Sequence, residues 1–451
     1  MKLIVIGGGL AGCEAAWQAA ERGVDVDLYE MRPQKTTGAH RTENFAELVC
    51  SNSLGSNLPN RASGLLKEEL RRMGSLLIKC ADASSLPAGG ALAVDRDRFS
   101  ESIKSRLEAH PRIRIIREEV TAIPDDPAII ATGPLTSPTL SNAIAALTGE
   151  DQMYFFDAIA PIVRAETVDM SVAFRANRYD KGEEEEGDYI NCPMNAEEYN
   201  NFQVALLAAE RITLRDFEAE EIEKGVKAGS EHFFQGCQPV EIIAGRGERS
   251  LAFGPMRPVG LTDPRTGRWP FAVVQLRQDN LAGDLYNLVG FQTNLTFPEQ
   301  KRVFRLIPGL EKAEFERYGQ MHRNTYIAAP KVLTDSSEFR QKPGLFAAGQ
   351  LAGVEGYAGN IASGLLAGIN AVQYLRGEAP IALPLTTMTG ALMHYITHAD
   401  LKDFQPTKAM FGLLPKPYDA KRRGKRERYD YYVDRARHDL EVYLTESDFM
   451  I

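Results

Sequence analysis

Residues 2–12 read KLIVIGGGLAG and place a short apolar strand directly before three glycines and then a fourth, in the spacing Gly7-x-Gly9-x-x-Gly12. In dinucleotide-binding folds the first glycine allows a tight turn, the second lets the backbone approach a pyrophosphate, and the third lets the next helix pack closely on the sheet. The phosphates then meet free N–H groups at the positive end of a helix. The stretch therefore predicts a nucleotide-binding turn made of Gly7, Gly8, Gly9, Leu10, Ala11 and Gly12.

The residues that follow support this prediction. An amphipathic segment from about Ala11 to Arg22 ends at Gly23, and VDVDLYE at residues 24–30 reads as a second strand closed by Glu30. At this position of the fold an acidic side chain accepts hydrogen bonds from a ribose 2′-hydroxyl, which favours FAD or NAD over a 2′-phosphorylated dinucleotide. The alternative is an ordinary glycine-rich turn between a strand and a helix.

Length and composition predict a folded protein of two domains. The chain has 451 residues, 44% of them hydrophobic and 25% charged, which is long for a single core. The N-terminal apolar run Leu3–Ile6 is too short for a signal peptide, and no stretch approaches the roughly 18 apolar residues of a membrane span. We therefore expect a cytoplasmic protein that does not enter a membrane. Because no C-x-x-C pair occurs, the five cysteines predict free thiols and no metal site: Cys13, Cys50, Cys80, Cys192 and Cys237.

The distribution of charge leaves a question about RNA. A net charge of −9 argues against indiscriminate nucleic-acid binding, since phosphate contacts need a basic surface. Residues 421–428, KRRGKRER, form a basic cluster followed by Tyr429, Tyr431 and Tyr432. Arginines beside tyrosines suit an RNA surface with stacked bases, whereas the simpler interpretation is a solvated helix face.

The order of strand and helix patterns predicts an α/β fold with an insertion. Residues 1–134 alternate strands and helices, apart from a long polar excursion at about 32–60, and long loops in compact domains usually carry function. Residues 135–321 change to mixed strands and helices broken by Pro and Gly. Residues 344–377 then restore a strand, a glycine-rich turn and a small-residue helix. We expect a discontinuous Rossmann-like FAD-binding domain, 1–134 and 322–451, with an inserted α+β domain, 135–321.

Three blocks together resemble one enzyme family: GGGLAGCEAAWQAAERGVDVDLYEMRP from residue 7, ELVCSNSLGSN from residue 47 and LFAAGQLAGVEGYAGNIASG from residue 345. They are similar to the folate-dependent tRNA uracil-5-methyltransferases called TrmFO. The first block is common to many flavoproteins, and the GQ-x-x-G-x-x-GY motif is shared with the longer GidA or MnmG type, so CSNS is the more telling motif.

The resemblance implies a reaction and its partners. The expected activity is methylation of C5 of uridine 54 in the T-loop of tRNA. The carbon would come from 5,10-methylenetetrahydrofolate and the electrons from FADH2, re-reduced by NADH or NADPH. Three other functions stay open: a GidA/MnmG-type modification of a wobble uridine, a small-molecule NAD(P)H-dependent flavin oxidoreductase, and a flavin-bearing RNA chaperone without chemistry.

The resemblance also implies roles for two cysteines. C5 of uracil is a poor nucleophile until a thiolate adds to C6. The resemblance favours Cys237 as that thiolate and Cys50 as a flavin-side residue, and their roles could be exchanged because sequence fixes neither distance nor pKa. Cys13 and Cys80 read as packed residues, while Cys192 shares the turn-like setting of Cys237.

Further residues are candidates for the cofactor and substrate pockets. Gly349 and Gln350 stand where many flavoproteins place an acidic residue for the ribityl chain, and Gln can still bond a hydroxyl. The other candidates for the flavin, folate or uracil pockets are Asn52, Ser53, Arg277, His322 and Tyr357. No general base is assigned.

Overall fold

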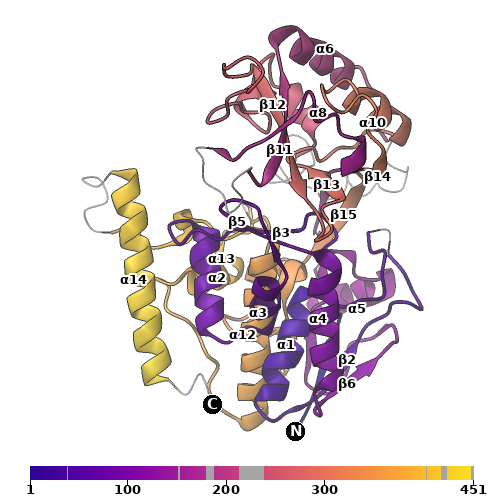
Figure 1. The fold of residues 1–451 in the computed structure, drawn as a ribbon. Coiled ribbons are helices and arrows are strands. Elements are labelled where there is room, and N and C mark those ends of the chain that lie inside the picture. The colour runs from indigo at the N-terminus through magenta and orange to yellow at the C-terminus, as the bar shows by residue number, and fades with distance from the viewer. Residues whose placement is uncertain are drawn as a thin grey trace.

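The computed structural model describes residues 1–37, 39–150, 153–178, 187–212, 238–402, 404–417 and 424–447. Figure 1 shows a lower lobe that holds both ends of the chain, an upper lobe built from its middle, and a long C-terminal helix, α14 (Lys425–Glu446), standing beside the lower lobe.

A parallel sheet forms the centre of the lower lobe. Its strands run in the order β16-β7-β1-β2-β6, and every neighbouring pair is parallel. The bounds are β1 (Lys2–Ile6), β2 (Asp25–Tyr29), β6 (Ile113–Ile116), β7 (Ala128–Ile130) and β16 (Leu345–Ala347). Because β2 lies on one side of β1 and β7 on the other, the strand order reverses at β1. Ligands of such sheets bind beyond the carboxyl ends of the strands at this point.

Two helices pack unusually closely against each other in this lobe. They are α1 (Leu10–Glu21) and α12 (Tyr357–Arg376). A Cβ added at Gly364 would lie 2.1 Å from the carbonyl oxygen of Ala11, and one at Gly368 would lie 2.6 Å from that of Ala15. The small residues of α12 are therefore required by the approach of α1, and this contact fixes the late glycine-rich turn over the first one.

The remaining elements of the lower lobe surround this core. The helices are α2 (Ala62–Arg72), α3 (Leu76–Ala83), α4 (Arg96–Ala109), α5 (Pro138–Thr148), α11 (Ala329–Val332) and α13 (Met388–His398), and a small antiparallel sheet joins β3 (Ser53–Ser56), β5 (Ala91–Val94) and β4 (Ser85–Leu86). Asp95 caps helix α4, since its carboxylate accepts a hydrogen bond of 2.9 Å from the N–H of Arg98.

The upper lobe is built on an antiparallel sheet of order β10-β11-β12-β13-β9-β14. Its strands are β9 (Ile162–Arg164), β10 (Phe174–Arg175), β11 (Tyr189–Met194), β12 (Ala272–Gln278), β13 (Leu285–Leu288) and β14 (Phe315–Arg317), and its helices are α6 (Ala196–Leu207), α8 (Val240–Ala244), α9 (Ser250–Phe253) and α10 (Phe297–Phe304). A two-stranded antiparallel ribbon, β8 (Met153–Ala158) with β15 (Met321–Tyr326), connects the lobes.

The fold class predicted from the sequence is confirmed: a Rossmann-like α/β domain carries a second domain of mixed strands and helices. Each lobe has its own hydrophobic core. Along the chain, the change from the lower core to the upper core falls between Ile144 and Val163, and the return falls between Ala313 and Tyr326. The domain limits at 134/135 and 321/322 stay a prediction. In the described parts of the chain, none of the helices combines the length and apolar character needed to cross a bilayer.

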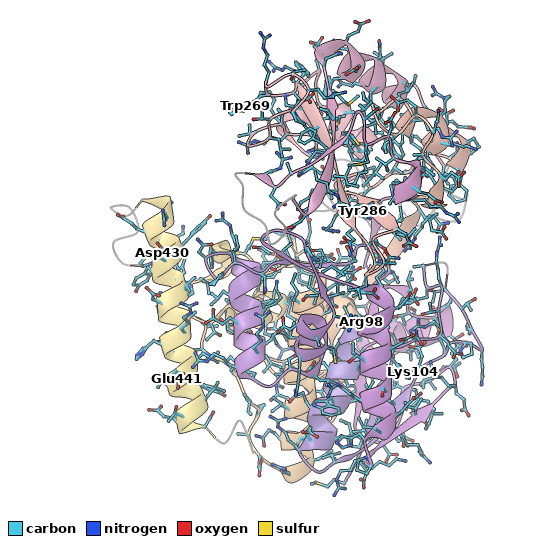
Figure 2. The ribbon with its side chains drawn as sticks, viewed as in Figure 1. Arg98, Lys104, Trp269, Tyr286, Asp430 and Glu441 are labelled. Carbon is cyan, nitrogen blue, oxygen red and sulfur yellow. The ribbon has the colours of Figure 1, made fainter. Side chains whose placement is uncertain are left out.

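The tyrosines of helix α14 are not exposed in the way that an RNA-stacking surface would require. Tyr432 is only 6% exposed, and the ring of Tyr429 packs 4.7 Å from that of Phe411, so these tyrosines face the protein. Figure 2 shows Asp430 and Glu441 along the same helix, and residues 421–423 of the basic cluster lie outside the described residues. The described part of the helix therefore fits the simpler interpretation of a solvated face.

Candidate active site

The glycine-rich turn after β1 has the geometry that a pyrophosphate requires. Gly7 has a φ of +107°, and a Cβ at Gly12 would lie 1.8 Å from the carbonyl oxygen of Gly7. A Cβ at Gly8 would meet the ring of Phe45 at 2.5 Å. At Gly9, in contrast, a Cβ would have no protein atom within 4 Å. The absence of a side chain at Gly9 therefore leaves room for a ligand.

Glu30 is held in position at the end of β2. Its Oε2 accepts a hydrogen bond of 2.9 Å from the N–H of Gly8, and its Oε1 accepts from the N–H and the Nε of Arg32, at 3.0 and 2.9 Å. Burial acts to raise the pKa of Glu30, but the bonds from Arg32 and Gly8 outweigh it and lower the pKa. A carboxylate can accept about four hydrogen bonds, so one acceptor position is left for a ribose hydroxyl.

A cleft of about 1040 Å³ opens beside this turn. It begins at Gly9 and Glu30, continues past Pro134, and reaches Gln350 and Tyr357. A long cleft with the glycine turn and a buried carboxylate at one end matches the shape and chemistry of an extended adenine dinucleotide. Among the described residues, no group of acidic, histidine or cysteine side chains is placed to hold a metal ion.

The late glycine-rich turn closes the other end of this cleft. Gly349 has a φ of +77°, and its N–H donates to the Ser363 hydroxyl at 3.0 Å. Gln350 donates through Nε2 to Glu355 at 3.0 Å and lines the cleft. Helix α12 begins at Tyr357, which lines the cleft, so the positive end of this helix would stabilise negative charge on a ligand bound there.

A second cavity, of about 1430 Å³, continues from the first. Pro134, Gln350 and Tyr357 line both, and the second cavity adds Cys50 and Ser53. The long polar excursion predicted to be functional therefore reaches the point where the two cavities meet.

Tyr357 holds the Cys50 segment at this junction. Its hydroxyl oxygen accepts hydrogen bonds from the backbone N–H groups of Cys50 and Ser51, at 2.8 and 3.1 Å. Burial raises the pKa of Tyr357 well above its usual value, so the phenol stays protonated at neutral pH. Tyr357 is thus a wall residue of both cavities and a support for Cys50.

Asn52 has a different role from the cofactor contact expected from sequence. It is 0% exposed and lines neither cavity. Its Nδ2 donates to the carbonyls of Val94 and Gln278, at 3.2 and 2.8 Å, and its Oδ1 accepts from Nε of Arg277 at 3.0 Å. Because Arg277 and Gln278 belong to β12, Asn52 ties the Cys50 segment to the upper lobe.

Three arginines surround the Cys50 segment; Arg277 and Arg317 are buried, and Arg96 is partly exposed. Arg277 donates to the Ser51 hydroxyl at 2.8 Å, and Arg96 donates to the Leu48 carbonyl and, at 3.1 Å, to Asp279. Arg317 is 7% exposed, and its Nε has no hydrogen-bond partner among the described residues. Burial and the positive charge of Arg96 lower its pKa to about 10.

This positive environment has a chemical consequence. The charges of all three arginines interact with Cys50, and nearby cations favour a thiolate or an anionic substrate group. Sequence reasoning named Arg277 but not Arg96 or Arg317, because no local motif distinguishes them from surface arginines.

The remaining cysteines differ from Cys50 in their surroundings. Cys13 is buried and its thiol donates to the Gly8 carbonyl at 3.3 Å; burial raises its pKa. Cys80 is also buried. Cys192 is buried as well, and burial raises its pKa to about 12. The sequence predicted a turn at Cys192, and this prediction was wrong because Cys192 lies inside strand β11. Cys237 lies outside the described residues, and its role stays a prediction.

Comparisons with known proteins agree on one family. Residues 2–379 match the family described as Glucose inhibited division protein A. Proteins named Methylenetetrahydrofolate--tRNA-(uracil-5-)-methyltransferase TrmFO from Heliobacterium modesticaldum and Lactobacillus gasseri are 55% and 54% identical. These alignments cover 99% and 98% of this chain and the same shares of the relatives.

A solved structure shares the fold. The structure of Aquifex aeolicus GidA superposes with a TM-score of 0.67 at 18% identity, covering 98% of this chain and 76% of that one. At this identity the likeness concerns the fold alone.

Proposed function

This chain belongs to the TrmFO family of folate-dependent tRNA uracil-5-methyltransferases, and from that premise we propose that it methylates C5 of uridine 54 in the T-loop of tRNA. The carbon donor is 5,10-methylenetetrahydrofolate and the reductant is bound FAD in its reduced form. NADH or NADPH re-reduces the flavin. We place the enzyme in the cytoplasm, where tRNA and reduced folate are available.

The structural observation that carries this proposal is the junction of the two cavities. Gly9 and Glu30 at one end of the first cleft would hold the adenosine part of a dinucleotide, and the cleft extends toward Gln350 and Tyr357. The second cavity begins at these same two residues and contains Cys50. A redox cofactor, a folate and a flipped-out base can therefore meet there, which a simple oxidoreductase of small molecules would not need.

The residues of the chain have separate tasks in this reaction. Reduced flavin supplies the hydride that completes the methyl group. The Gly7–Gly12 turn and Glu30 would hold the adenosine diphosphate portion of FAD, and Gln350 would bind polar groups at the other end of the cleft. Tyr357 and Asn52 keep the Cys50 backbone in place.

The two thiols are assigned to different substrates. We propose that Cys237 adds to C6 of uracil as a thiolate, which turns C5 into a carbon nucleophile. We assign Cys50, which lines the second cavity and interacts with three arginines, to activation of the methylene donor. Excluding water around these groups prevents loss of the activated carbon to hydrolysis.

An isotope experiment tests the proposed function. The purified enzyme is incubated with an unmodified tRNA transcript, NADPH or NADH, and methylenetetrahydrofolate labelled at the methylene carbon; nucleosides are then analysed by mass spectrometry. We expect labelled 5-methyluridine, absent when cytidine replaces the target uridine. Methylation only with S-adenosylmethionine, or label only in a wobble uridine, would contradict the proposal.

A further inference from the structure

The upper lobe exposes two aromatic rings next to several arginines. Trp269 is 64% exposed and Phe253 is 74% exposed, the latter at the end of α9. Figure 2 shows Trp269 at the outer edge of the upper lobe. We call the exposed side chains of Phe253, Trp269, Arg249, Arg257 and Arg268 the Trp269 face.

Contacts within the lobe hold this face together. The guanidinium carbon of Arg249 lies 5.4 Å from the ring centre of Phe253 and 5.1 Å from that of Phe271. Phe271, two residues after Trp269, packs 5.1 Å from Tyr199. Helix α9 and the start of β12 are also joined by a 2.9 Å hydrogen bond from the N–H of Val273 to the carbonyl of Met256. Arg249 therefore joins the exposed ring of Phe253 to Phe271, and Trp269 is two residues from Phe271 in the chain.

The segment that carries these residues is rich in arginine, although the chain has a negative net charge and Glu198 of α6 interacts electrostatically with Arg265. Residues 246–271 contain five arginines and only two carboxylates, Glu248 and Asp263, while the whole chain carries −9. Asp263 is already bonded to Arg265, at 2.9 and 3.1 Å. Within the described ranges, no carboxylate pairs with Arg249, Arg257 or Arg268. An exposed aromatic ring among unpaired arginines is the composition of a surface that stacks bases and binds phosphates.

The position of the Trp269 face relative to Cys50 follows from β12. This strand runs from Ala272 to Gln278, and its last residues contact Asn52 at the site. Seven residues of strand span about 23 Å, so the Trp269 face lies at the far end of β12 from the cavities. A small substrate cannot touch both places, but a folded RNA can.

Resting on the proposed function, we propose that the Trp269 face is a second docking surface for the substrate tRNA. An unpaired base stacks on Trp269, and the phosphates beside it bind Arg249, Arg257 and Arg268. This contact is distant from the target uridine, so it contributes to binding of the RNA and not to the chemical step. Helix α14, whose described tyrosines face the protein, does not supply such stacking.

Tryptophan fluorescence tests this directly because the chain has only two tryptophans. Trp17 lies in α1 with its ring against His110, and a Trp17→Phe variant leaves Trp269 as the single reporter. We expect unmodified tRNA transcript to quench and shift the emission of Trp269, and to protect it from acrylamide. Emission that does not change at saturating tRNA would overturn the proposal.

Kinetics with matched variants provide the second test. Trp269→Ala should raise the KM for tRNA about 5- to 150-fold, the range of one lost base stack, and leave kcat within twofold. Combined replacement of Arg249, Arg257 and Arg268 by Ala should lower the salt slope of tRNA binding by about 2 to 3, one phosphate contact each. Arg112→Ala, which removes an exposed arginine of the lower lobe, is the control and should change neither quantity.

The outcomes separate this proposal from the proposed function. If wild-type enzyme makes no 5-methyluridine, the proposed function fails, whereas an active wild type with unchanged KM in Trp269→Ala removes only the docking surface. Oxidation of NADPH by the bound flavin reports folding and should be equal in all variants. If Trp269 emission responds to concentration of the enzyme without RNA, the face binds a second copy of the chain and the proposal is wrong.

Discussion

Replacing Asn52 by alanine should show whether this residue positions Cys50 for catalysis in addition to stabilising the folded protein. The buried amide makes three hydrogen bonds, one with the charged Arg277 and two with the carbonyls of Gln278 and Val94. A bond to a charged group contributes about 1.5–3 kcal/mol and a neutral one about 1 kcal/mol. The expected loss in the free energy of unfolding is therefore about 4 kcal/mol.

Most of this loss concerns the contact between the lobes, because Arg277 and Gln278 belong to β12. The variant should unfold at a lower urea concentration by circular dichroism. Under conditions where it is fully folded, kcat for methyl transfer should fall at least tenfold, since Cys50 is two residues from the lost amide.

Asn370 provides a matched control. It is also buried, accepts a hydrogen bond from the N–H of Ile381 at 2.7 Å, and donates to the carbonyls of Ile381 and Ser336 at 3.2 and 3.5 Å. Asn370→Ala should cost about 3 kcal/mol and leave kcat within twofold, because α12 carries this residue away from the cavities. Equal kcat losses in the two variants, or a loss of less than 1 kcal/mol in Asn52→Ala, would refute the reasoning.

Three other outcomes follow from the described contacts. The Cβ of Gly9→Ala meets no protein atom within 4 Å, so this variant should fold but retain little FAD. Gly12→Ala should retain little FAD and also lose stability in thermal unfolding. A Gly9→Ala protein that keeps its yellow flavin would mean that the pyrophosphate binds elsewhere. Tyr357→Phe leaves the N–H of Cys50 without its acceptor, and it should shift the flavin absorbance spectrum and cost about 1–2 kcal/mol in urea unfolding. Burial raises the pKa of Glu69 to about 7 from an ordinary 4.5. Between these two pH values the folded state therefore binds a proton that the unfolded state has lost. The stability that this proton provides should be complete below pH 4.5 and lost as the pH rises through 7. Glu69→Gln should remove that part of the pH dependence, and identical slopes for both proteins would contradict the assignment.

The amino-acid sequence by itself determined the features that depend on neighbours in the chain. The spacing Gly7-x-Gly9-x-x-Gly12 predicts the turn because a Cβ at Gly12 cannot coexist with the Gly7 carbonyl. The strand that directly precedes Glu30 follows from the local sequence pattern in the same way. The resemblance in the CSNS and GQ motifs then identified the family, and the comparisons confirm it.

Only the tertiary structure decided which distant residues meet. Arg96, Arg277 and Arg317 come from three separate elements, and nothing near them in the chain indicates that they surround Cys50. Asn52 reads as a polar loop residue, yet packing of β12 against its segment buries it completely. The direction of a side chain on an amphipathic helix or loop depends on what packs against it. For that reason the sequence alone does not show that Tyr432 on α14 is buried and that Trp269 on the upper lobe is exposed.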